Sequence, residues 1–187
     1  MSVQFLALVG SLRAGSHNRQ LAETAVKLAP AGSDVQLFEG LAEIPFYNED
    51  IDVPGSVPAA AQQLRDAAAG ADALLFFTPE YNGTIPAVLK NAIDWLSRPY
   101  GAGALSDKPV AVLGTAFGQY GGAWAQDETR KSVGIAGGKV LADVKLSIPG
   151  SVTRFAETHP GDDAEVVAQL TEFIKLVHDH AGTAAAA

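Results

Sequence analysis

The chain carries an unusual loop at residues 10–18, with the sequence Gly-Ser-Leu-Arg-Ala-Gly-Ser-His-Asn. The loop follows an apolar run, Val3 to Val9, and precedes a segment with helical periodicity. Backbone N–H groups at a helix N-terminus favour an anion, and Ser11, Ser16 and Asn18 can donate further hydrogen bonds. Arg13 adds a positive charge. These residues predict a site for a phosphorylated ligand.

Two common phosphate-binding signatures do not fit this loop. Gly10 and Gly15 have the spacing of a P-loop, but Ser16 stands where that motif requires a lysine. The dinucleotide fingerprint requires three glycines at GxGxxG spacing, which the loop lacks. The pattern therefore favours a cradle for one phosphate monoester, although the same residues also suit a plain helix cap and a tight turn.

Composition narrows the class of protein. The 187 residues, 48% hydrophobic and 18% charged, are typical of a single globular domain. A net charge of -8 without a dense Lys/Arg cluster argues against a nucleic-acid partner, and the lack of cysteine excludes disulfides and thiol catalysis. The first apolar run is short and has no basic leader, and no segment has the length of a membrane span. We therefore expect a cytoplasmic protein with no membrane partner.

Apolar runs alternate with helical stripes along the whole chain. This alternation predicts an α/β fold, a flavodoxin-like, doubly wound, five-stranded parallel sheet of order 2-1-3-4-5 with helices on both faces. We expect one domain over residues 1–181 and a frayed tail over residues 182–187. The expected strands are Val3 to Val9, Val35 to Phe38, Ala73 to Thr78, Val110 to Ala116 and Val140 to Ile148. The expected helices are Asn18 to Leu28, Val57 to Ala69, Pro86 to Ser97, Gly122 to Ala136 and Ala164 to His180.

In such a sheet, ligands bind at the carboxyl ends of the strands, where the loops after strands one, three and four converge. The loop after strand three contains Asn82-Gly83, which suits a turn with positive φ, and displays Tyr81. The loop after strand four, residues 114–122, combines glycines with aromatic side chains. Together these loops predict a cleft for a planar ligand with polar edges.

The segments GSLRAGSHN and PEYNGTIPAVLKNAIDWLSRP resemble the NAD(P)H-dependent FMN reductase family, which includes flavin, quinone, azo-dye and chromate reductases. The segment at residues 44–50, IPFYNED, is similar to the family pattern LPxYNxD, so the resemblance covers nearly the whole chain. Where close relatives read SPG, this chain has Ala116-Phe117-Gly118 and lacks the serine hydroxyl; Trp124 stands where we expect an arginine.

The resemblance implies two groups of cofactor-binding residues. The FMN phosphate would be surrounded by Ser11, Arg13, Ser16, His17 and Asn18. The isoalloxazine would be lined by Pro79, Glu80, Tyr81, Asn82 and Gly83 and closed over by the loop containing Thr115, Ala116, Phe117 and Gly118.

The implied function is electron transfer from NADPH or NADH, through FMN, to a small acceptor such as a quinone or free flavin, in a ping-pong mechanism. We expect no general acid or base and no metal, because FMN itself carries the hydride chemistry. The alternative is a flavodoxin-like FMN electron carrier that does not turn over a nicotinamide, which the acidic charge would also suit.

Aromatic residues suggest an assembly. Trp95, Tyr100 and the Pro45-Phe46-Tyr47 segment occupy helix-end and loop positions that suit a subunit contact, although Trp95 could equally belong to the core. The family resemblance also implies a homodimer or homotetramer whose partner loops border the flavin cleft. We therefore expect at least a homodimer.

Overall fold

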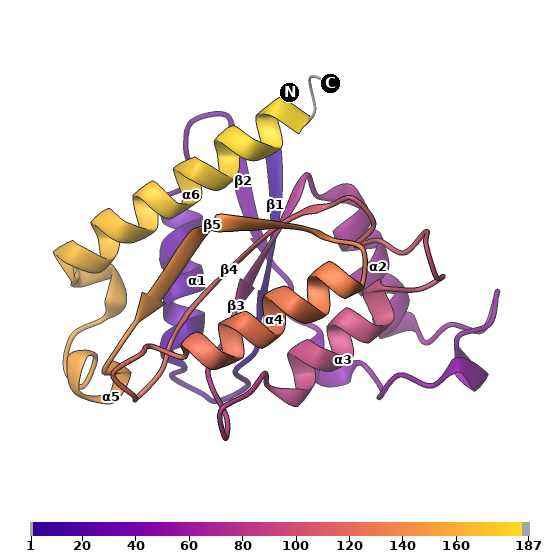
Figure 1. The fold of residues 1–187 in the computed structure, drawn as a ribbon, viewed down its shortest axis with the longest axis horizontal. Coiled ribbons are helices and arrows are strands. Elements are labelled where there is room, and N and C mark those ends of the chain that lie inside the picture. The colour runs from indigo at the N-terminus through magenta and orange to yellow at the C-terminus, as the bar shows by residue number, and fades with distance from the viewer. Residues whose placement is uncertain (1, 185–187) are drawn as a thin grey trace.

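The computed structural model describes residues 2–184. Its centre is an all-parallel sheet of order β2-β1-β3-β4-β5, covered by α1 and α6 on one face and by α2, α3 and α4 on the other (Figure 1). The expected fold is confirmed. The strands are β1 (Val3–Val9), β2 (Ser33–Leu37), β3 (Ala73–Phe77), β4 (Pro109–Thr115) and β5 (Lys139–Ile148). The helices are α1 (His17–Lys27), α2 (Ala59–Gly70), α3 (Ala87–Leu96), α4 (Ala123–Ile135), α5 (Ser151–Arg154) and α6 (Ala164–Ala184).

The central strands are apolar on both faces because helices cover both sides of the sheet. Every residue of β3 and β4 is buried, and the last five residues of β1 are buried as well. Such strands have near-continuous apolar sequences, which is the pattern that predicts a parallel sheet. The sheet therefore holds the carboxyl ends of β1, β3 and β4 side by side.

The two largest differences from the sequence-based expectation follow β5, and the other boundaries of strands and helices lie within two residues of those expected. The short helix α5 follows β5 where no helix is expected, and α6 continues to Ala184, past the stop expected at Gly182. Ala181 and Ala184 have the highest helix propensity, and a single glycine costs only about 1 kcal/mol, so one glycine near the end does not have to stop the helix. Residues 182–184 of the expected tail are thus helical, and residues 185–187 lie outside the described residues.

Trp95 belongs to the core of the monomer, so of its two expected places the core is confirmed and the subunit contact is wrong. Its side chain is fully buried, and its indole N–H donates to the Pro45 carbonyl at 2.8 Å. Tyr47 packs edge-on against the indole at 5.1 Å, and the Arg65 guanidinium lies 5.2 Å from the ring centre. The loop after β2 folds back over the Trp95 side chain and buries it. This contact is long-range, so local sequence does not reveal it.

Within residues 2–184, no helix is long and apolar enough to cross a membrane. The same residues contain no group of three or more His, Asp or Glu side chains placed to hold a metal ion.

Candidate functional site

A cavity of about 200 Å³ lies where the loops after β1, β3 and β4 meet. Most of the residues expected at the site line it. They are Ser11, Arg13, Ser16, His17, Asn18, Pro79, Glu80, Tyr81, Thr115, Ala116 and Phe117. Asn82, Gly83 and Gly118 do not border this cavity, whereas Ser151, which is not among the expected residues, does.

The first turn of α1 presents hydrogen-bond donors to the cavity. Ser16 caps the helix, because its hydroxyl oxygen accepts from the Arg19 N–H at 3.3 Å. The backbone N–H groups of His17 and Asn18 have no acceptor among the described residues. Arg13 donates to the Gly15 carbonyl at 3.2 Å, and no carboxylate in residues 2–184 lies within ion-pair distance of it. This side of the cavity therefore carries positive charge and free donors.

The Asn18 side chain also has a structural role, which the sequence does not predict. Its side chain is buried, donates to the Thr115 carbonyl at 2.9 Å and accepts from the Thr115 N–H at 3.0 Å. One Nδ2–H and the Oδ1 of the amide thus bond the backbone of β4, and the second Nδ2–H has no partner among the described residues. The Asn18 side chain fixes the start of α1 to the end of β4, and its second Nδ2–H and its backbone N–H remain for a ligand.

His17 packs against the segment that follows β5. Its imidazole meets the Phe155 ring edge-on, with 5.4 Å between ring centres. Burial, followed by the nearby Arg13 charge, lowers the pKa of His17 below its ordinary value. A neutral imidazole at physiological pH can donate one hydrogen bond without adding a second charge beside Arg13.

The loop after β3 ends in a tight hairpin. Tyr81 and Thr84 exchange two backbone hydrogen bonds of 3.2 Å, and Asn82 and Gly83 between them have φ values of 54° and 77°. Positive φ at both central residues defines a type I′ turn, for which Asn-Gly is the favoured pair. The predicted positive-φ turn is confirmed, and it leaves Tyr81 half exposed beside the cavity.

Glu80 joins the loop after β3 to α4. Gly122, the N-cap residue of α4, offers no side chain to the first turn of the helix. A carboxylate oxygen of Glu80 accepts instead from the Ala125 N–H at 3.2 Å. A carboxylate at a helix N-terminus also interacts favourably with the helix dipole. Glu80 thus fixes the loop after β3, which lines the cavity, to the start of α4.

Four exposed aromatic side chains form a rim beside the cavity, which we call the aromatic rim: Tyr81, Phe117, Tyr120 and Trp124. The Tyr120 and Trp124 rings lie 6.5 Å apart, and Trp124 sits within van der Waals reach of the hairpin at Gly83. Planar apolar surfaces of this kind suit stacking with a flat ligand.

A larger cavity, of about 540 Å³, lies between α3 and α4 near Arg98 and Ile135. It shares none of its lining residues with the three converging loops. The chemistry of the donors, and not the volume, therefore identifies the candidate site.

The chain matches the family described as NADPH-dependent FMN reductase over residues 3–153. It belongs to that family. The match includes the loops after β1, β3 and β4 and ends within α5, so it spans the whole lining of the cavity. The resemblance found in the sequence is confirmed.

Curated relatives and a solved structure agree with the family. The chain is 44% identical over 131 residues to an NAD(P)H-dependent FMN reductase of Pseudomonas aeruginosa, covering 70% of this chain and 69% of that protein. It is 42% identical over 130 residues to a 2-hydroxy-1,4-benzoquinone reductase of a Burkholderia species, with coverage of 70% and 69%. The structure of FerB, a flavoenzyme NAD(P)H:(acceptor) oxidoreductase of Paracoccus denitrificans, matches with a TM-score of 0.77 at 28% identity, over 95% of this chain and 98% of FerB.

The donor set of the cavity fits the phosphate end of FMN. A phosphate monoester needs several hydrogen-bond donors and positive charge, since it has three acceptor oxygens and nearly two negative charges. The free N–H groups of His17 and Asn18, the Ser11 and Ser16 hydroxyls and Arg13 supply both. Glu80 is the carboxylate in the lining, and it is held by α4.

Sequence reasoning misses Ser151. It considers the loops after β1, β3 and β4, whereas Ser151 follows β5. A signal is present nonetheless, because the carboxyl end of β5 lies at the same edge of the sheet as that of β4.

Proposed function

We propose that the chain is an FMN-dependent oxidoreductase that transfers electrons from NADPH or NADH to quinones or similar small acceptors, including free flavin, by a ping-pong mechanism. The observation that carries the proposal is the cavity in which free donors and Arg13 converge, in a chain of the FMN reductase family. When bound, FMN accepts hydride from a nicotinamide and passes electrons to an oxidised acceptor.

The residues of the chain bind and orient the cofactor. Ser11, Arg13, Ser16, His17 and the backbone N–H of Asn18 would hold the phosphate, which fixes the cofactor at one end. Pro79 to Gly83 and Thr115 to Gly118 would border the ring. Asn18 ties α1 to Thr115 at the end of β4, and Glu80 ties the loop after β3 to the first turn of α4.

The aromatic rim supports an aromatic acceptor. Tyr81 and Phe117 line the cavity, and Tyr120 and Trp124 extend the apolar surface outward. A planar quinone can stack on such a surface, and two relatives carry the names FMN reductase and benzoquinone reductase. No side chain is proposed as a general acid or base.

The test is reduction of bound flavin by a nicotinamide. The purified protein, loaded with FMN and kept free of oxygen, is mixed with NADPH or NADH in a stopped-flow spectrometer. We expect the visible absorbance of the oxidised flavin to bleach, and to return when a quinone is added. Flavin that stays oxidised for minutes with both nicotinamides would favour the FMN electron carrier instead.

We also propose a single FMN-binding domain over residues 1–181, located in the cytoplasm and assembled at least as a homodimer. Phe46 and Tyr100 support the assembly, because both side chains are largely exposed in the monomer. Trp95 does not support it, because its side chain is buried.

A further inference from the structure

The turn after β5 is fastened to the loop after β4. The Ser151 N–H donates to the Ala116 carbonyl at 3.0 Å, and the Gly150 N–H donates to the Gly118 carbonyl at 3.4 Å. At the end of β5, the Ile148 carbonyl accepts from the Thr115 hydroxyl at 2.7 Å. These bonds place Ser151 beside the loop that borders the candidate cavity.

Ser151 is buried, and its hydroxyl has no partner in the described chain. The residue is 7% exposed and lines the same cavity as Arg13, Ser16 and His17. Among the described residues, no hydrogen bond is formed by its hydroxyl oxygen. Although the residue is largely buried, its hydroxyl oxygen is not among the fully enclosed atoms of the described chain, so it opens on the cavity and is free to bond a ligand atom there.

We infer that Ser151 is a further cofactor-binding residue, whose hydroxyl donates a hydrogen bond to the phosphate of FMN. The inference rests on the proposed function, since it concerns the same cavity. The phosphate is favoured over the ring because α5 leads directly to Phe155, which packs on His17 at the first turn of α1. That turn also carries the free N–H groups of His17 and Asn18.

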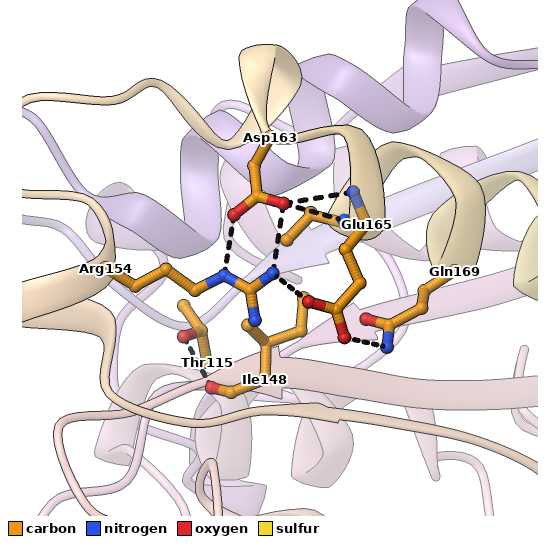
Figure 2. Close-up of polar contacts among 7 residues, drawn as sticks. Thr115, Ile148, Arg154, Asp163, Glu165 and Gln169 are labelled. Carbon is orange, nitrogen blue, oxygen red and sulfur yellow. Dashed lines mark hydrogen bonds and ion pairs between the residues drawn. The ribbon is translucent and has the colours of Figure 1, made fainter.

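An ion pair fixes the turn that bears Ser151. Figure 2 shows the Arg154 guanidinium forming two bonds to the Asp163 carboxylate, at 2.7 and 3.0 Å, and a third to Glu165 at 2.8 Å. Asp163 also accepts from the N–H groups of Glu165 and Val166, both at 3.1 Å, at the start of α6. Arg154 therefore attaches α5 to the N-terminus of the longest helix, and it acts as a positioning residue for Ser151.

The first experiment measures FMN and riboflavin binding to the FMN-free protein by quenching of flavin fluorescence. We expect S151A to weaken FMN roughly tenfold or more, as for the loss of a hydrogen bond to a charged group, and to leave riboflavin unchanged. T153A is the matched control, because Thr153 is exposed two residues further along α5. Since the Ser151 hydroxyl has no partner in the described chain, S151A should fold normally.

The possible outcomes distinguish three failures: of the Ser151 contact, of its assignment to the phosphate, and of the proposed function. Unchanged FMN affinity in S151A overturns the inference, and an equal loss for FMN and riboflavin overturns the assignment to the phosphate. A wild-type protein that binds neither flavin contradicts the proposed function itself, which distinguishes that failure from the other two.

A double-mutant cycle tests Arg154. If Arg154 acts through Ser151, R154M should weaken FMN in the wild-type background and have little further effect in the S151A background. Riboflavin affinity should not change in either background. Equal losses of FMN affinity in both backgrounds would overturn the positioning role.

Discussion

At the scale of single residues, Arg13 brings to the cavity a positive charge that no carboxylate in the described chain neutralises. Its position in the loop after β1 places it beside the free N–H groups of α1. A negatively charged phosphate and a positively charged guanidinium attract each other, and they form short, directional hydrogen bonds. The side chain is exposed, so a bound phosphate would also limit its motion.

We expect R13A to weaken FMN binding by about 1.5–3 kcal/mol, roughly 10- to 150-fold, with riboflavin affinity unchanged. Fluorescence titration of both flavins measures this. K27A is the control, because it removes the same charge from the far end of α1, where Lys27 is exposed. If K27A weakens FMN as much as R13A, the effect is long-range electrostatics and Arg13 does not contact the phosphate.

At the scale of elements, the site is a junction of loops joined by a few specific contacts. Asn18 joins α1 to β4, and Glu80 joins the loop after β3 to α4. Gly114 allows β4 to approach β3, because a Cβ at this position would collide with the Thr78 carbonyl oxygen and lie 3.1 Å from the Asn18 amide oxygen. The cavity therefore depends on a close approach of two backbones.

We expect G114A to destabilise the fold by more than about 1–3 kcal/mol, the usual cost of overpacking, because backbone atoms and not a flexible side chain oppose the added methyl group. Denaturant unfolding of the FMN-free protein measures the change. Gly70→Ala is the matched control, since a Cβ there would meet nothing within 4 Å. Equal stability of the two variants would show that β4 can shift away from β3 at little cost.

The link between α5 and α6 should depend on pH. The Arg154 guanidinium lowers the pKa of Asp163 to about 2, further supported by the Val166 N–H. A carboxyl with a depressed pKa in the folded state stabilises the fold above its unfolded pKa, near 4, and this stabilisation is lost as the pH falls towards 2.

We therefore expect D163N to have a lower free energy of unfolding than the wild-type protein at pH 6. The difference between the two free energies should shrink as the pH falls from about 4 to 2. Denaturant titrations across this range measure it. D162N is the control, because it makes the same change at an exposed neighbour. If the difference in free energy of unfolding stays constant with pH, the ion pair is not the cause of that difference.

At the scale of the whole molecule, the exposed aromatics of the α2, α3 and α4 layer bear on assembly. Phe46 is 78% exposed and Tyr100 is 91% exposed. Trp95, in contrast, is buried beneath the loop that carries Phe46. Large exposed aromatic side chains are typical of interface centres. A two-fold contact through this surface would fit a homodimer.

We expect F46D to convert an assembled protein to monomers without loss of monomer stability, because the side chain has few contacts within its own chain. Multi-angle light scattering measures the mass. V26D is the control, since Val26 is an exposed position on α1, in the opposite layer. A wild-type protein that is monomeric at micromolar concentration contradicts the homodimer.

The sequence by itself determined the sheet and most of the cavity lining. Apolar runs and helical stripes are local patterns, so β1, β3 and β4 can be predicted with ends correct to within about two residues. Parallel strands bring their carboxyl ends to one edge, so the loops that follow them can be combined into one site from strand order alone. The Asn82-Gly83 turn follows from the φ values that only a few residues tolerate.

The tertiary structure alone decided what each polar side chain contacts. Asn18 and Thr115 are 97 residues apart, and nothing in the loop at residues 10–18 indicates that the Asn18 amide is taken by β4. Local sequence leaves Trp95 open between core and interface, because the loop that buries it is 50 residues away along the chain. Ser151 joins the site because the turn after β5 bonds to Ala116. Hydrogen-bond partners and burial depend on which distant segments meet, whereas local periodicity reports only how each segment folds.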